Sequence, residues 1–122
     1  MQNTIYKDEI LEHYRNPFHF GPLKIFTKKA EQVNPFCGDE ITIYIHIENE
    51  LVKDVSFIGK GCAISVASTS ILLEYAKDKQ KKLLTNFTEE DMLSMLGIEI
   101  SETRKKCALL GYFVLRDCLN QS

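Results

Sequence analysis

A strictly alternating segment over residues 40–48 constrains the fold of this 122-residue chain more than any other feature. Isoleucine occupies every second position of this segment, and the positions between carry polar, charged or amphipathic side chains. Successive side chains of a β-strand point to opposite faces, so this alternation predicts a strand with one buried face and one solvated face. The two predicted faces are Ile41, Ile43, Ile45 and Ile47 on one side and Thr42, Tyr44, His46 and Glu48 on the other.

Two further strands are predicted beside this one. Residues 51–58 are predicted as a second strand, in which Val55 and Phe57 share a face, and a turn near residues 48–50 joins it to the first. So short a connection requires antiparallel pairing. A third strand is predicted at about residues 30–34, before Pro35. The expected sheet is small, three-stranded and antiparallel.

Helical periodicity surrounds these strands. A helix is predicted over residues 3–15, because apolar residues recur there at helical spacing and Asn16-Pro17 ends the pattern. Its expected buried face is Ile5, Ile10, Leu11 and Tyr14. Further helices are predicted over residues 63–77, from a capping signal at Thr88 to Gly97, and from Ser101 to about Leu119. This order predicts an α+β fold with the helices packed on one face of the sheet.

Length and composition narrow the class of protein. A chain of this length predicts one domain over residues 1–122. The net charge of −2 argues against a general nucleic-acid surface, and no apolar run approaches the roughly 18 residues of a membrane span. We therefore expect a cytoplasmic protein, in which the four cysteines are reduced and serve as ligands, nucleophiles or core residues.

Three of the cysteines lie in segments that core packing explains poorly. Cys37 is followed by Gly38 and Asp39, Cys62 follows Gly61 at a predicted helix start, and Cys107 follows a basic run. Each alone has an ordinary interpretation, as a turn residue, a small residue under a helix, or a helix-face core residue. Together they favour a shared metal site of three thiolates and one carboxylate, suited to iron with sulfide or to zinc.

The remaining cysteine and the histidines are interpreted differently. Cys118 lies eleven residues after Cys107 on the same predicted helix, about 16 Å along its axis, and is expected in the core. His13, His19 and His46 have no ligand-like spacing and are expected to be surface or structural residues.

These motifs resemble the IscU/SufU/NifU-N family of iron–sulfur cluster assembly scaffolds. The matching segments are Asn34-Pro35-x-Cys37-Gly38-Asp39, Gly59-x-Gly61-Cys62-x-Ile64-Ser65, Cys107 at the start of the last helix, and His13-Tyr14-x-Asn16-Pro17. The resemblance implies a compact SufE/NifU-like α+β fold in which Cys37, Asp39, Cys62 and Cys107 converge at one exposed end. It also implies a pyridoxal-phosphate-dependent cysteine desulfurase of the SufS, IscS or NifS type as sulfur donor.

Two features divide the resemblance between branches of the family. Lys106 stands where IscU-type members carry a histidine before the third cysteine, and Arg104-x-x-Cys107-Ala108 is similar to the SufU pattern, in which the arginine engages the desulfurase. The 44 residues between Cys62 and Cys107, however, are close to the IscU spacing. The chain is SufU-like in motif and IscU-like in length.

The resemblance implies a scaffold that accepts sulfur on Cys107 or Cys37, binds iron, and assembles a transient [2Fe–2S] cluster for apo iron–sulfur proteins. Asp39 is expected to be the labile ligand, because a carboxylate binds iron less tightly than a thiolate. A zinc-dependent sulfurtransferase that accepts persulfide from the desulfurase is the alternative, and a purely structural zinc module is a third possibility. A monomer or weak oligomer is expected.

Overall fold

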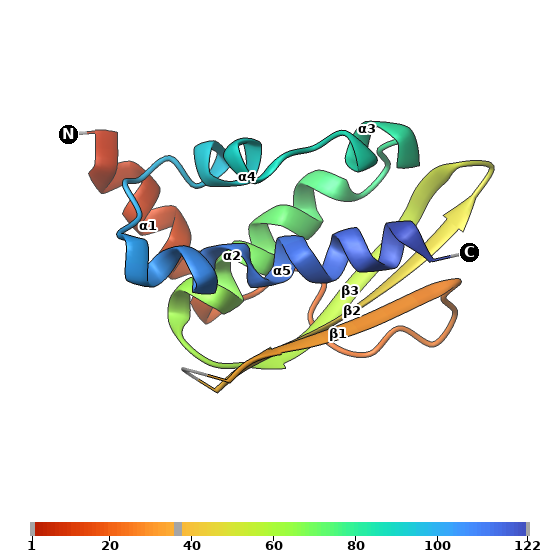
Figure 1. Ribbon diagram of the computed structural model, residues 1–122, viewed down its shortest axis with the longest axis horizontal. Coiled ribbons are helices and arrows are strands. Elements are labelled where there is room, and N and C mark those ends of the chain that lie inside the picture. Colours follow the sequence, from red (N-terminus) through yellow and green to blue (C-terminus); the bar gives the residue numbers. More distant parts are fainter. Residues whose placement is uncertain (1, 36–37, 122) are drawn as a thin grey trace.

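The computed structural model describes residues 2–35 and 38–121 of the chain. Phe36 and Cys37 lie outside the described residues. The elements in chain order are α1 (Gln2–Arg15), β1 (Lys28–Asn34), β2 (Asp39–Glu48), β3 (Leu51–Lys60), α2 (Ala63–Ala76), α3 (Lys81–Thr85), α4 (Glu89–Leu96) and α5 (Glu102–Asn120). The helices lie on one side of the sheet (Figure 1), which confirms the predicted α+β class.

The sheet has the order β1-β2-β3, and both pairings are antiparallel. Ile43 of β2 lies opposite Ala30 of β1 and Phe57 of β3. The β2–β3 hairpin closes through Asn49 and Glu50, whose φ angles are 53° and 64°. Two central residues with positive φ match the twist of antiparallel strands, so this short turn fixes the hairpin register.

The core lies between the isoleucine face of β2 and the helices. Ile41, Ile43 and Ile45 are fully buried there, and Phe57 and Val55 of β3 extend the same surface. Helix α2 crosses this surface and is buried on most sides, which accounts for its small and apolar residues. Its serines and threonines are poor helix formers, so packing supplies much of the stability of this helix.

The prediction that the other face of β2 is solvated is wrong in its central part. Thr42 and Tyr44 are 6% and 7% exposed. Phe20 forms a bridge to Phe57 at the β3 edge, whereas the Thr27 N–H donates to the Ile45 carbonyl on the β1 side. The segment between Phe20 and Thr27 therefore crosses the outer face of the sheet, where the centre of the Phe26 ring lies 5.2 Å from the centre of the Tyr44 ring.

The predicted buried face of α1 also needs correction. Leu11 and Tyr14 are 43% and 44% exposed, whereas Ile10 and His13 are buried. His13 can be buried because its Nδ1 lies 2.8 Å from the Ser70 hydroxyl of α2, which satisfies its polar ring. This histidine is a structural residue, one of the two roles expected for it.

The C-terminal helix α5 packs against α2 and the sheet. Cys118 lies on its buried side, as predicted, and its thiol is 3.6 Å from the Ile43 carbonyl oxygen. Burial, followed by the nearby charge of Asp117, raises the pKa of the Cys118 thiol to about 12. Among the described residues, no helix is both long enough and apolar enough to cross a membrane.

Candidate metal centre

Asp39 is the first residue of β2, and its side chain is 0% exposed. Its Oδ1 accepts a hydrogen bond of 2.9 Å from the Cys62 backbone N–H. Gly61, at φ 142°, makes this approach possible, since a Cβ at that position would lie 2.7 Å from the Asp39 Cγ and 2.9 Å from its Cα. A glycine is therefore required beside the carboxylate.

Cys62 is the N-cap of α2 and is only partly buried. Its Sγ lies 3.8 Å from the Asp39 Oδ2 and 3.6 Å from the Ser65 hydroxyl. The β3–α2 connection thus presents both a backbone N–H and a thiol to one carboxylate. Because Cys62 is partly exposed, the site lies close to solvent at this residue.

Cys107 reaches the same place from α5. Gly111 packs directly on Thr69 of α2, and one turn earlier in both helices the Ser65 hydroxyl lies 3.3 Å from the Cys107 carbonyl oxygen. The contacts advance together along both helices, so α2 and α5 run parallel here, as Figure 1 shows. This close packing places Cys107 beside the start of α2, with its side chain 7% exposed.

The three described side chains converge. The candidate ligand atoms of Asp39, Cys62 and Cys107 all lie within 4.8 Å of one another. Ligand atoms around a tetrahedral zinc lie roughly 3.6–3.8 Å apart, from zinc–sulfur and zinc–oxygen bonds of about 2.3 and 2.1 Å. Small side-chain movements would therefore bring these donors onto one ion, and two thiols with a carboxylate suit zinc or iron. Cys37, the fourth predicted ligand, lies outside the described residues.

Ser65 is a member of this cluster that the sequence analysis placed in a matching segment but did not assign to the site. It is fully buried, and its hydroxyl donates a hydrogen bond of 2.5 Å to the Asp39 Oδ2. The available signal was its position three residues after Cys62 on a predicted helix, which places both on one side. Its contact with Asp39, however, depends on how β2 meets α2, which the local sequence does not show.

Basic and apolar residues flank the cluster. Arg104 and Lys106 are both exposed in the N-terminal part of α5. A groove of about 280 Å³ lies next to them and is lined by Val33, Asn34, Pro35, Lys106, Leu110 and Phe113. The groove runs between the end of β1 and α5, so it adjoins the segments that carry the predicted ligands.

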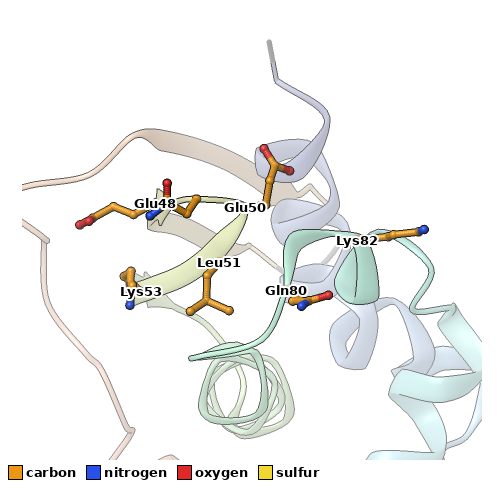
Figure 2. A pocket seen from close by; sticks show the side chains of 7 residues that line it. Glu48, Glu50, Leu51, Lys53, Gln80 and Lys82 are labelled. Atoms are coloured by element: carbon orange, nitrogen blue, oxygen red, sulfur yellow. The ribbon is translucent and has the colours of Figure 1, made fainter.

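A larger pocket, of about 520 Å³, lies at the other end of the sheet. It is lined by Glu48, Asn49, Glu50, Leu51, Lys53, Gln80 and Lys82 (Figure 2). Glu48 lies nine positions after Asp39 along β2, or about 30 Å at the usual rise. This pocket mixes acidic and basic side chains and contains no cysteine, so it is not part of the candidate metal centre.

Comparisons with known proteins show the family to which the chain is similar. The family model for the NifU-like N-terminal domain matches residues 5–121. The iron–sulfur cluster assembly scaffold protein IscU of Thermotoga maritima is 30% identical over 133 residues, which cover 96% of this chain and 94% of that protein. The zinc-dependent sulfurtransferase SufU of Bacillus subtilis is 28% identical over 130 residues, which cover 93% of this chain and 88% of that protein.

A solved structure has the same fold. The crystal structure of a protein proposed as an iron–sulfur cluster assembly scaffold for the SUF system, from Fervidobacterium islandicum AW-1, superimposes with a TM-score of 0.80. The two sequences are 28% identical, and the match covers 98% of this chain and 100% of that one. The resemblance predicted from the sequence is thereby confirmed for the family and the fold.

Proposed function

The chain belongs to the NifU-like N-terminal domain family, and on this basis we propose that it is an iron–sulfur cluster assembly scaffold. It accepts sulfur from a cysteine desulfurase, binds iron, and assembles a [2Fe–2S] cluster that passes to apo iron–sulfur proteins. The observation that carries the proposal is the convergence of Asp39, Cys62 and Cys107 within 4.8 Å at one end of the fold. Cys37, two residues before Asp39, is proposed as the remaining ligand.

The donor set suits a cargo that must enter and leave. Thiolates bind iron and zinc strongly, whereas a carboxylate is a weaker ligand for either metal once thiolates are present. Asp39 is held by hydrogen bonds from Cys62 and Ser65, so its carboxylate has defined partners whenever it is not bound to metal. We therefore assign Asp39 as the ligand that exchanges during cluster release.

Sulfur enters as the outer sulfur of a persulfide on the desulfurase. A thiolate of the scaffold attacks that sulfur, the sulfur–sulfur bond of the donor breaks, and the donor cysteine leaves as thiolate. Cys37 and Cys107 are the proposed acceptors. Cys107 is 7% exposed, so its thiol must become accessible before the attack, whereas Cys62 is already partly exposed.

The experiment is an anaerobic absorption time course with desulfurase, cysteine, a thiol reductant and ferrous iron. A growing sulfur-to-iron charge-transfer band is expected with the wild-type protein and with Cys118→Ala, the matched control that changes a cysteine outside the site. Substitution of Cys37, Cys62 or Cys107 by Ala should abolish the band. An equal band from all four variants would contradict the proposed ligands.

Zinc-dependent sulfur transfer is the second candidate function. Arg104 favours it, because this exposed residue lies one helical turn before Cys107, where it can contact a docked desulfurase. Zinc would be held by the same proposed ligands, and displacement of one of them would free a thiolate to attack the persulfide. Retained zinc, absence of the iron–sulfur band, and faster desulfurase turnover that depends on Arg104 would support this function over the scaffold.

A further inference from the structure

We propose that Ser65 is a positioning residue of the metal centre, which acts by holding the Asp39 carboxylate in the orientation that binds metal. The inference rests on the proposed function of the site. It concerns a residue that is not itself a proposed ligand and that lies, fully buried, between the three described ligand residues. Its hydroxyl is within 3.6 Å of one atom from each of them.

The short contact identifies where the Ser65 proton points. A serine hydroxyl has one proton to donate and two lone pairs that can accept. The 2.5 Å separation from the Asp39 Oδ2 is in the range of a charge-assisted O–H···O⁻ hydrogen bond, whereas the Cys107 carbonyl oxygen is 3.3 Å away. The proton is therefore assigned to the carboxylate, and the hydroxyl can still accept from the Cys62 thiol at 3.6 Å.

Both carboxylate oxygens are thus held by the first turn of α2. Oδ1 accepts from the Cys62 N–H and Oδ2 from Ser65, so the Asp39 side chain is fixed at both oxygens. The Cys62 thiol donates to the same Oδ2 at 3.8 Å, so the carboxylate held in this orientation faces a proposed thiol ligand.

Loss of the Ser65 hydroxyl would release this orientation. In Ser65→Ala, Oδ2 loses the 2.5 Å hydrogen bond from the hydroxyl in a fully buried position, so the orientation of the carboxylate is less firmly fixed. Residues that hydrogen-bond to metal ligands typically contribute about 10–100-fold to metal affinity. We therefore expect Ser65→Ala to weaken zinc or cobalt binding by about 10–100-fold.

The test measures the affinity for Zn²⁺ by chelator competition, and the visible spectrum of the Co²⁺-substituted protein, in folded metal-free samples. The Thr and Val side chains have nearly the same volume, but Thr carries a hydroxyl where Val carries a methyl group. Comparing Ser65→Thr with Ser65→Val therefore controls for the effect of added volume on folding. Thr should bind close to the wild-type level, whereas Val and Ala should bind weakly and alter the Co²⁺ ligand-field bands. Ser68→Ala removes a buried serine of the same helix outside the cluster and should leave affinity unchanged.

The same substitution in an Asp39→Ala background shows whether Ser65 acts through Asp39. If it does, Ser65→Ala should have little further effect there, because the carboxylate that it positions is absent. Equal losses in both backgrounds, or equal binding by the Thr and Val variants, would overturn the inference while leaving the proposed function intact. Failure of the wild-type protein to bind either ion would overturn both.

Discussion

The closest packing at the candidate metal centre occurs at Gly61, and substitution by alanine tests it directly. Gly61 has φ 142°, and an added Cβ would lie 2.9 Å from the Asp39 Cα, which is a backbone atom and cannot move independently. Backbone strain of this kind costs about 1–3 kcal/mol. Overpacking against Asp39 costs about 1–3 kcal/mol more. We expect Gly61→Ala to lower the free energy of unfolding by about 2–6 kcal/mol.

Gly38→Ala is the matched control at the same site. Gly38 also has positive φ, at 72°, but an added Cβ there would meet nothing within 4 Å. Gly38→Ala should lower the free energy of unfolding only by the left-handed backbone strain, about 1–2 kcal/mol. Urea denaturation of both variants, followed by far-UV circular dichroism with a chelator present, gives the two values. If Gly61→Ala is no less stable than Gly38→Ala, the close approach of Gly61 to Asp39 is not a constraint on the fold.

Four further predictions concern other parts of the molecule. The pKa of the Cys118 thiol is raised from 9.0 to about 12 in the folded protein, so its stabilising contribution is complete below pH 9.0 and decreases above that pH. The stability advantage of wild type over Cys118→Ala should therefore shrink by about 1.4 kcal/mol by about pH 10. An unchanged difference in denaturation midpoints would refute this. Thr88→Ala removes the hydroxyl that accepts from the Asp91 N–H, and should cost about 1 kcal/mol in the same assay. Gly111→Ala should weaken zinc affinity by forcing α5 away from Thr69. Adding Thr69→Ala to that variant should restore part of the affinity, and no restoration would exclude this contact as the cause. Removal of metal by a chelator should leave the far-UV spectrum unchanged, because the hydrophobic core is continuous without the site; unfolding would instead support a structural zinc module.

Local patterns in the sequence predicted most of the secondary structure. The alternation of Ile41 to Ile47 identified β2, and the start of α4 followed from Thr88, whose capping box with Asp91 is present. These signals are carried by residues close together in the chain. Helix α3 was not predicted, because it has only five residues and its start is fixed by pairing of Gln80 with Leu51 at the hairpin.

Contacts between distant segments account for what the sequence did not show. Tyr44 looked solvated because nothing local indicates that the segment before β1 crosses the outer face of the sheet. Cys62 and Cys107 could be proposed as partners from residue type, yet their proximity depends on the packing of α5 against α2. Ser65 joins the site for the same reason, and its role was therefore visible only in the structure.

The central claim is that Cys37, Asp39, Cys62 and Cys107 bind one metal centre. X-ray absorption fine structure at the zinc edge of the zinc-loaded protein tests it most directly, since sulfur and oxygen ligands scatter differently. We expect three sulfur ligands and one oxygen ligand per zinc, with one sulfur replaced by a lighter ligand in each of the single cysteine-to-alanine variants and all three sulfurs retained in Asp39→Ala. A zinc shell without sulfur, or one unchanged by all four substitutions, would contradict the account.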